Sequence, residues 1–367
     1  MILADLDREL AAPIEALIAD GTLPPRVARI APGHTWRPGP DGNPASFATS
    51  LPFELGAVAA RDPADVAARL AAPMRELPWV AAAEHTGDGY LTITVTARAL
   101  GQAAGRLAAA GSAAARSAIL AGTTATVRPW PDPAAAASWR RAWQDHAAAM
   151  TGRLATAAGA SATVTTSGER GPSGVGAART AQPTVAAAVA WYGVPSVRYG
   201  LARTTPGRVT RLGTLLAPGS WGTDPLYPVQ QAHASAAATL RWAAALNQPV
   251  TSPGERAGDL LSSAAEQALL GLLPWLPVRV AAAARRHRPD EVPGYLESVG
   301  AAWLAVRQLA PALPFGGRAA SSDAATVGAR LMLADAVRAV LAAGLALAGI
   351  QVGAGAIEPA AKRVTLR

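Results

Sequence analysis

The stretch DPLYPVQQAHASAAATLRW, from Asp224 to Trp242, decides how the C-terminal half of this chain is interpreted. It reads as the start of a helix, with polar groups in its first turns and plain Ala and Leu after them. Those polar groups are Tyr227, Gln230 and His233. The pattern predicts either a recognition surface or, as the alternative, side chains that cap the helix and hydrogen-bond to its neighbours, because buried polar groups need partners.

The sequence around this stretch is helical from about residue 184 to residue 349. Prolines divide it into separate helices, as expected of a residue that ends helices. The last of these, Asp323–Ala348, has apolar residues at helical spacing, namely Val327, Leu331, Ala334, Val337, Leu341 and Leu345. We therefore predict that residues 191–367 form an all-α helical bundle.

One segment of this bundle is free of charge over nearly the length of a short membrane span. It runs from Ala339 to Ile357 and is rich in Ala and Gly rather than Leu. Its composition and length favour a buried helix over a span. No membrane contact is predicted.

The N-terminal part has a different pattern, which predicts a small α+β domain over residues 1–130. The segment LADLDRELAAPIEALIAD, before Gly21, has apolar residues at steps of three and four and predicts a helix. Two further helices are expected at 46–61 and 63–72. LTITVT (91–96) alternates apolar and Thr residues and predicts a strand, and TATVRPW (124–130) is a second candidate strand.

A basic connector rich in Pro and Gly is expected at residues 131–190. It includes a short helix at about 134–158, followed by a flexible loop at 159–183 that has little apolar bulk. The loop contains GERGPSGVG (Gly168–Gly176). This glycine-rich segment is interpreted as flexible, because no strand and helix flank it as a dinucleotide site requires.

The positive charge of the chain is uneven. The net charge of the chain is +8. Nearly all of its positive charge comes from arginine, since Lys362 is the only lysine. Residues 1–130 have 11 basic and 12 acidic residues, 131–220 have 9 and 3, and 221–367 have 13 and 10. The excess in the last two thirds fits a polyanionic partner and fits a solvated basic surface equally well.

Common catalytic and metal-binding patterns are missing from the sequence. There is no cysteine, no phosphate-binding loop with Lys and Ser/Thr, and no Gly-x-Ser-x-Gly. The five histidines have no pair at metal-ligand spacing; they are His34, His85, His146, His233 and His287. No metal and no cofactor are therefore expected. The acidic N-terminus lacks the features of a signal peptide, so a cytoplasmic location is expected.

Three segments resemble arginyl-tRNA synthetases. The first, DPLYPVQQAHASAAATLR, is similar to the start of that family's anticodon-binding domain, with matches at Pro225, Tyr227, Val229, Gln230, Ala232, His233 and Ala234. YGVPSVRYGLART (Tyr192–Thr204) resembles a segment upstream of it, with matches at Gly193, Val194, Val197, Arg198, Tyr199 and Leu201. ARLMLADAVRAVLAAGLALAGI (Ala329–Ile350) resembles the family's last helix.

The N-terminal part is more loosely similar to the additional N-terminal domain of the same synthetases. The similar segments are NPASFATSLPFELG (Asn43–Gly56) and GYLTITVT (Gly89–Thr96). Between the two ends, the family has a nucleotide-binding catalytic domain with His-x-Gly-His and Met-Ser-x-x-x-Gly motifs, which this sequence lacks. The resemblance therefore implies a synthetase-related anticodon-binding (DALR domain) protein without the catalytic domain, and no strand–helix repeat is expected in its place.

The first segment also departs from the family. Pro228 and Gln231 replace two tyrosines, which removes aromatic rings that could stack on unpaired bases, and Ser235 replaces an arginine. The C-terminal tail differs as well. Reading of an anticodon is therefore the least supported part of the resemblance.

Together these observations predict a non-catalytic protein that binds tRNA or another structured RNA. The expected phosphate contacts are Arg198, Arg203, Arg208, Arg211 and Arg241, and the residues expected near bases are Tyr227, Gln230 and His233. A protein-binding regulatory scaffold derived from a synthetase is the alternative. An arginine–tRNA ligase is a third hypothesis, which the missing motifs oppose.

Overall fold

The computed structural model describes residues 2–29, 36–87, 89–165, 183–216, 224–248, 256–313 and 323–352. The chain forms two compact units. Unit 1 contains Met1–Ala109, Thr239–Val278 and Ala305–Ala336, and unit 2 contains Ala110–Ala238, Arg279–Leu304 and Val337–Arg367. Each unit combines segments that are distant in sequence, whereas the sequence suggests three successive parts. The boundaries at residues 130 and 190 stay predictions.

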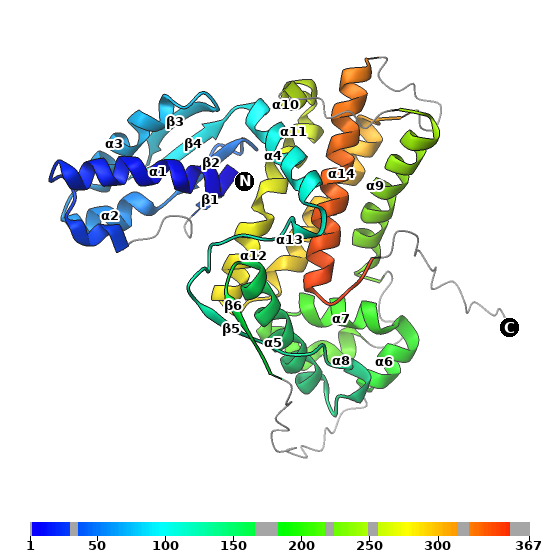
Figure 1. Ribbon diagram of the computed structural model, residues 1–367. Coiled ribbons are helices and arrows are strands. Elements are labelled where there is room, and N and C mark those ends of the chain that lie inside the picture. The colour runs from blue at the N-terminus through cyan, green and yellow to red at the C-terminus, as the bar shows by residue number, and fades with distance from the viewer. Residues whose placement is uncertain are drawn as a thin grey trace. The chain divides into compact units, whose positions relative to one another are not determined.

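The N-terminal part of unit 1 is an antiparallel sheet with helices packed on it, in the strand order β1-β2-β4-β3 (Figure 1). The strands are β1 (Trp36–Pro38), β2 (Ser46–Thr49), β3 (Val80–Thr86) and β4 (Tyr90–Val95). The helices are α1 (Ile2–Ala19), α2 (Leu51–Ala59) and α3 (Pro63–Arg75), with a 3-10 turn, η1 (Pro25–Arg29). Helix α3 packs on β3 and β4, and α1 packs on α3. The predicted α+β character is confirmed.

Helix α1 and strand β4 follow the patterns that predicted them. The apolar stripe of α1 is buried from Leu3 to Leu17, and the chain leaves the helix at Gly21, whose φ of 80° favours glycine. In β4, Leu91 and Ile93 are fully buried. Thr92 is also buried, because β4 has a paired strand on each side, so the expected polar face of this strand is only partly present.

The helix expected over residues 46–61 is wrong in its first part. Ser46–Thr49 form strand β2, all four residues are buried, and the strand pairs with β1 on one side and β4 on the other. Tertiary pairing decides this segment rather than local propensity. The helix begins only at Leu51, where Pro52 suits the first turn.

Strand β3 and helix α4 (Ala97–Ala110) were not anticipated from the sequence. The β3 sequence, VAAAEHT, has three alanines and little β propensity. Its pairing with β4 and the packing of α3 hold it in place. Helix α4 buries Leu100, Ala103 and Leu107 on one side, which is an ordinary amphipathic pattern.

The rest of unit 1 is helical and approaches α4 and the sheet closely. Its elements include α10 (Ala257–Leu260), α11 (Ala264–Leu272) and the 3-10 turn η6 (Leu273–Trp275). A Cβ at Gly101 would lie 2.3 Å from the backbone nitrogen of Gly258, so α4 and α10 meet backbone to backbone. The rings of Phe47 and Trp275 lie 5.5 Å apart, which joins the sheet to this helical part.

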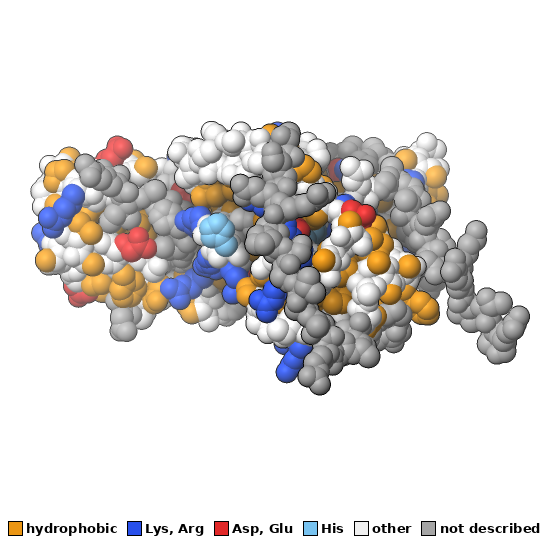
Figure 2. Space-filling view, turned by 90° about the horizontal axis from the view of Figure 1, so that it is seen from below, with side chains coloured by type: hydrophobic (Ala, Val, Ile, Leu, Met, Phe, Trp, Pro, Cys, Tyr) orange, Lys and Arg blue, Asp and Glu red, His pale blue; other side chains and the backbone are white. Residues whose placement is uncertain are grey.

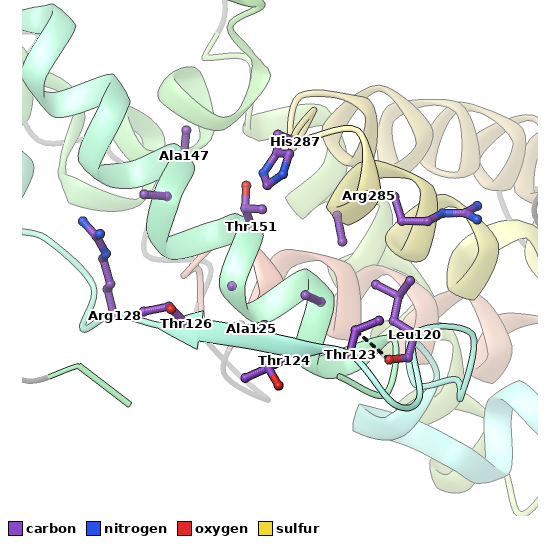
Figure 3. Close-up of a pocket in the computed structure, with 14 residues that line it drawn as sticks. Leu120, Thr123, Thr124, Ala125, Thr126, Arg128, Ala147, Thr151, Arg285 and His287 are labelled. Carbon is purple, nitrogen blue, oxygen red and sulfur yellow. Dashed lines mark hydrogen bonds between the residues drawn. The ribbon is translucent and has the colours of Figure 1, made fainter. Parts of the chain in front are cut away.

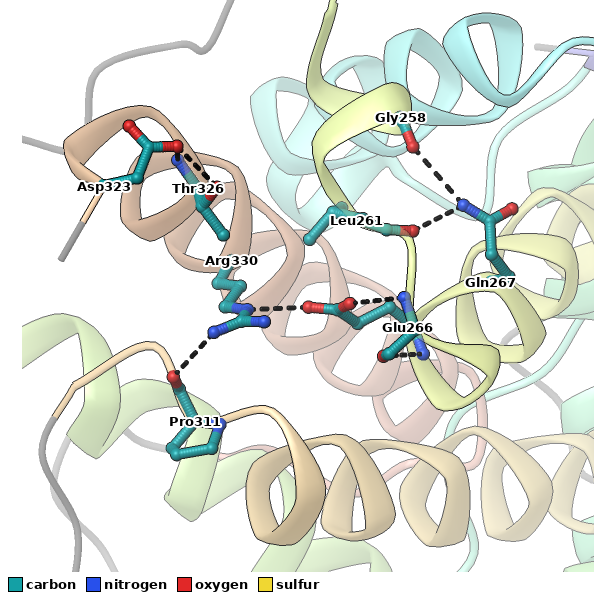
Figure 4. Close-up of polar contacts among 9 residues, drawn as sticks. Gly258, Leu261, Glu266, Gln267, Pro311, Asp323, Thr326 and Arg330 are labelled. Atoms are coloured by element: carbon teal, nitrogen blue, oxygen red, sulfur yellow. Dashed lines mark hydrogen bonds and ion pairs between the residues drawn. The ribbon is translucent and has the colours of Figure 1, made fainter. Parts of the chain in front are cut away.

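A buried ion pair fixes α11 within unit 1 (Figure 4). Arg330 Nε lies 2.7 Å from Oε1 of Glu266, and the Glu266 side chain is only 1% exposed. The same carboxylate accepts a hydrogen bond from the backbone N–H of Ser263, whose hydroxyl caps the helix in return. Arg330 also donates to the carbonyl of Pro311. Each charge in this network therefore has hydrogen-bonding partners, which a buried ion pair requires.

Unit 2 contains a small β-α-β unit that corrects three expectations. Strand β5 (Thr124–Val127) pairs in parallel with β6 (Ser161–Val164), and helix α5 (Trp139–Ala157) connects them and packs on both (Figure 1). The candidate strand at 124–130 thus pairs outside the N-terminal sheet. The expected loop at 159–183 begins with a strand, while 166–182 lie outside the described residues. One strand–helix–strand unit is present where none was expected.

Helices form the remainder of unit 2 and share its main core with α5. They include α6 (Val185–Tyr192), α7 (Val194–Arg203) and α8 (Leu212–Leu215), with the 3-10 turns η3 (Pro133–Ala135) and η4 (Pro206–Arg211). Their core residues are Trp139, Ala142, Val185, Ala188, Val197, Leu201, Val209, Leu212 and Leu216.

Four helices contribute residues to both units: α9 (Tyr227–Ala245), α12 (Leu276–Arg285), α13 (Glu291–Leu309) and α14 (Ala324–Leu347). Helix α14 matches the predicted Asp323–Ala348, and all six residues of its predicted apolar stripe are buried. The helical character predicted for the C-terminal part is confirmed for the described residues. Residues 353–357 of the uncharged segment lie outside them.

Within the described part of the chain, one apolar stretch is long enough to cross a membrane. It is Ala264–Arg285, with a mean hydropathy of 1.3 in its most apolar window. This window is 72% buried inside the protein, as is usual for a core helix, so the stretch is weak evidence for a span.

Candidate nucleic-acid interface

Helix α7 and turn η4 place four of the arginines predicted to contact phosphates. Gly193, with a φ of 83°, separates α6 from α7, and Pro195 occupies the first turn of α7. Val197 and Leu201 then face the core of unit 2. The arginines on this segment differ in what their side chains contact.

Arg198 is engaged inside unit 2. Its guanidinium donates to the carbonyl of Gly349 at 3.0 Å and to the carbonyl of Pro131 at 3.2 Å. Burial lowers the pKa of Arg198, and the charge of Asp132 offsets part of this effect. The predicted phosphate contact at Arg198 would require these internal hydrogen bonds to break.

Arg203 is paired with an acid but is still accessible. Its Nε lies 2.7 Å from Oε1 of Glu297, and about half of its side chain is exposed. The hydroxyl of the buried Tyr199 lies 3.2 Å from the same carboxylate, and burial together with the Glu297 charge raises the pKa of Tyr199. A phosphate at Arg203 would compete with Glu297.

Arg208 and Arg211 are accessible to solvent. Both lie on turn η4, and both are exposed. Neither forms an ion pair with a residue in the described part of the chain. Val209 lies between them and is buried in the core, which anchors the turn. Of the arginines predicted as phosphate contacts in unit 2, these two are the ones whose side chains have no partner among the described residues.

The residues predicted near bases lie at the start of α9. Asp224 precedes this helix, and its carboxylate accepts a hydrogen bond from the backbone N–H of Leu226. Tyr227 is 49% exposed and Gln230 is half-buried. His233 is buried, and burial, with a smaller contribution from the charge of Arg338, lowers its pKa to about 4. Tyr227 is therefore accessible to a base, whereas the geometry of His233 favours the alternative of a structural role.

Arg241 lies later on α9 and is exposed. It belongs to unit 1, whereas the other seven predicted residues belong to unit 2. Two further exposed apolar side chains, Trp242 and Leu246, follow it one helical turn apart.

An aromatic and cationic cluster in unit 2 was not identified from the sequence. Trp130 stacks on His146 with ring centroids 5.2 Å apart, and the guanidinium of Arg153 lies 4.0 Å from the centre of the Trp130 ring. His146 is 1% exposed, and neither ring nitrogen has a hydrogen-bond partner among the described residues. Burial, together with the charges of Arg198 and Arg153, lowers the pKa of His146 to about 3. No spacing in the sequence signals this arrangement.

A second feature missed by the sequence is an open pocket of about 610 Å³ in unit 2 (Figure 3). Strand β5, helix α5 and the end of α12 form it. Its polar lining is threonine and basic residues, namely Thr123, Thr124, Thr126, Thr151, Arg128, Arg285 and His287. Figure 2 shows basic side chains gathered around one histidine on the face turned to the viewer. Among the described residues, no group of three or more His, Asp or Glu side chains is placed to hold a metal ion.

Comparison with protein families identifies the C-terminal part. Residues 229–353 match the family described as "DALR anticodon binding domain". The matched range includes nearly all of α9 and continues through α14, so it contains Gln230, His233 and Arg241 but not Tyr227 or the arginines of α7 and η4. This chain contains a DALR anticodon-binding domain.

Comparison with curated proteins gives relatives named arginine–tRNA ligase, which match the C-terminal portion. The Micrococcus luteus protein is 34% identical over 165 residues, which are 44% of this chain and 29% of the relative. The Frankia alni protein is 34% identical over 158 residues, and the Pseudarthrobacter chlorophenolicus protein is 33% identical over 162 residues. These matches cover 43% and 44% of this chain, and 28% and 29% of the relatives. The chain thus spans less than a third of the length of these relatives.

Proposed function

We propose that this chain is a non-catalytic RNA-binding protein that takes tRNA, or another structured RNA, through its DALR domain and the adjoining α7–η4 segment. Location in the cytoplasm, where tRNA is abundant, is part of the proposal. The DALR match at residues 229–353 is the observation that carries it. The exposed positions of Arg208, Arg211 and Tyr227 support it.

Two observations support the absence of aminoacylation activity. The sequence has neither the His-x-Gly-His nor the Met-Ser-x-x-x-Gly motif of arginyl-tRNA synthetases. In the described part of the chain, the only parallel strands are the pair β5 and β6, which is too few for a doubly wound nucleotide-binding sheet. The arginine–tRNA ligase hypothesis therefore fits the chain least well.

A specific observation favours the second candidate, a protein-binding scaffold. Trp242 on α9 and Leu246, the residue directly after this helix, are 50% and 58% exposed and lie one turn apart, as the apolar residues of a helix-mediated protein contact would. Pro228 and Gln231 also remove the tyrosines that arginyl-tRNA synthetases have at these positions.

Titration of the protein with total tRNA at several KCl concentrations separates these candidates. Electrostatic binding predicts that affinity falls steeply with salt. Arg208→Ala and Arg211→Ala should each weaken binding to all tRNAs. Each should also lower the slope of log affinity against log salt concentration by about one in magnitude. Tyr227→Ala should change the preference among tRNAs while leaving that slope nearly intact, because stacking is not ionic.

Two results would reject the proposal. No retention of tRNA at low salt, together with protein capture that depends on Trp242 and Leu246, would favour the scaffold. Arginine-dependent exchange of pyrophosphate with ATP above background would show that the ligase activity is present.

A further inference from the structure

The pocket beside β5 has a charge pattern that the DALR domain does not explain. Four consecutive residues, Arg285, Arg286, His287 and Arg288, follow the body of helix α12. Arg286 pairs with Glu291 at 3.4 Å, and Arg288 pairs with Asp290 at 2.7 Å. Arg285 and His287, the two members that line the pocket, have no acidic partner in the described part of the chain.

The opposite wall of the pocket also has a basic side chain without an acidic partner among the described residues. Arg128 follows β5, is exposed, and forms no ion pair with a described residue. No Asp or Glu is among the residues that line the pocket. Burial and the neighbouring charge of Arg286 lower the pKa of Arg285. An anion in the pocket would offset both effects, because it would replace lost hydration and reduce the repulsion between the two arginines.

The backbone at His287 supplies an independent observation. His287 closes α12 with a φ of 53°, and Arg288 donates to the carbonyl of Ala283 at 2.9 Å, which completes a Schellman-type helix end. Glycine favours this conformation and occupies the equivalent position after α14, at Gly349. An imidazole is therefore held at the pocket in a conformation that glycine would adopt with less strain, which is typical of a functional position.

The shape of the pocket indicates more than one anionic group. Figure 3 shows Arg128 and Arg285 at opposite ends, with His287 and Thr151 between them. The five residue steps from Thr123 to Arg128 span about 16 Å in an extended strand, several times the width of one phosphate. The hydroxyls of Thr124 and Thr126 can donate hydrogen bonds to phosphate oxygens, whereas the hydroxyl of Thr123 already donates to the carbonyl of Leu120.

From these observations we infer that the pocket is a groove for single-stranded RNA, in which Arg128 and Arg285 contact separate phosphates of one strand and His287 contacts the backbone between them. This inference rests on the proposed RNA-binding function and adds a second contact surface to it. The groove lies outside the α7–η4 segment, and most of its residues precede the DALR match.

Fluorescence anisotropy with a labelled oligouridine of twelve nucleotides tests the groove on the full chain. The double variant Arg128→Gln/Arg285→Gln should raise the dissociation constant about tenfold. It should also lower the slope of log affinity against log salt concentration by about 1.4 in magnitude, because each single-strand phosphate contact contributes about 0.7 to that slope. Arg286→Gln is the matched control, since it removes the same charge from the next residue, whose side chain pairs with Glu291 outside the pocket. This control should change oligouridine binding much less.

His287→Gly separates binding from folding. It should weaken oligouridine binding two- to fivefold while leaving the melting temperature equal or higher, because glycine relieves the backbone strain at this position. A lowered melting temperature with unchanged binding would show that His287 is structural only.

The remaining outcomes distinguish this inference from the proposed function. If the double variant binds oligouridine as the wild type does while Arg208→Ala/Arg211→Ala weakens tRNA binding, the groove is wrong and the proposed function stands. If inorganic phosphate or a mononucleotide displaces the oligomer at equal phosphate concentration, the pocket holds a single anion and not a strand. If the wild type binds neither tRNA nor oligouridine at low salt, the proposed function itself fails.

Discussion

Two arginines, Arg330 in unit 1 and Arg198 in unit 2, are held inside the protein in different ways. Arg330 has a carboxylate partner, Glu266, whose other oxygen is hydrogen-bonded as well (Figure 4). Arg198 donates to two backbone carbonyls and lies near the ring of Trp130, with a second arginine, Arg153, on the same ring.

The difference shows two ways of placing positive charge among helices. A carboxylate balances the charge of Arg330 but leaves each partner dependent on the other. Carbonyl dipoles and a ring face accommodate Arg198 without a hydrogen-bonded acid, and its charge, which Asp132 offsets only in part, also acts on its neighbours. His146 stays neutral beside Arg198 and Arg153 for this reason, in addition to its burial.

The largest effect is expected from breaking the paired site. Glu266→Gln removes the charge that balances Arg330 and should lower the free energy of unfolding by about 3–5 kcal/mol, as for other broken buried pairs. Chemical denaturation measures this change. The double variant Glu266→Leu/Arg330→Met is the control, because replacing both charges with apolar groups should restore much of the loss. A cost below about 1 kcal/mol for Glu266→Gln would mean that the pair behaves as a surface pair.

The second-largest loss of stability is expected at Gly349, whose carbonyl accepts a hydrogen bond from Arg198. Gly349 has a φ of 77°, and a Cβ there would lie 2.7 Å from the Trp130 ring. Gly349→Ala should therefore cost about 2–4 kcal/mol, from the left-handed backbone and the steric conflict together. Gly21→Ala is a matched control in denaturation experiments, since it has a similar φ of 80° but open space around it. Equal costs at the two sites would show that the Trp130 contact adds nothing.

The buried His146, which lies beside Arg198, should make the free energy of unfolding depend on pH. The pKa of His146 is about 3 in the folded protein and 6.5 for a free histidine side chain, so the unfolded chain binds more protons between these limits. The stability contribution is complete above pH 6.5 and is lost as the pH falls, by about 1.4 kcal/mol per pH unit. His146→Leu should remove this slope in denaturation series at pH 4.5–7.

Two other groups contribute to the same series. His233, with a pKa of about 4, acts in the same direction as His146. Asp7 acts in the opposite direction, because burial raises its pKa to about 6 and its protonated form is favoured in the folded state. Asp7→Asn should therefore steepen the pH dependence below pH 6. If His146→Leu leaves the slope of the free energy of unfolding against pH unchanged, burial beside Trp130 and Arg153 does not keep His146 unprotonated.

The smallest effect is expected at an exposed pair. Arg203 and Glu297 are 54% and 29% exposed at their side chains, so solvent screens their attraction. Arg203→Gln should change the free energy of unfolding by about 0.2–1 kcal/mol, with a dependence on salt. A cost approaching that of Glu266→Gln would remove the distinction between buried and exposed pairs in this protein.

The sequence predicts the parts of this fold that have strong local periodicity. The stripes of α1 and α14 are buried as expected, and LTITVT is a strand. Ser46–Thr49 and Val80–Thr86 were missed because pairing with a neighbouring strand of the sheet, not composition, makes them strands; the partner β4 is distant in sequence from the first and adjacent to the second. Local pattern cannot supply information that lies in the partner strand.

For the candidate site as well, local sequence pattern predicts only what does not depend on contacts with distant segments. The resemblance to arginyl-tRNA synthetases indicated the DALR segment, and the exposed arginines of η4 agree with a phosphate role that stays a prediction. Arg198 looked equivalent to them in sequence, but its acceptor at Gly349 lies 151 residues away. His287 and Arg128 belong to no motif, and only the folded chain brings them to one pocket.

The β-α-β unit of residues 124–164 has a consequence for exchange of its amide hydrogens with solvent. All four residues of β6 are exposed, and in the described part of the chain this strand pairs only with β5. Because α5 is anchored in the core of unit 2 whereas β6 is exposed, β6 can separate from β5 without opening the rest of the unit. Deuterium should therefore enter β6 far sooner than the buried centre of α14, and the exchange rate of the β6 amides would measure how often this strand separates from β5.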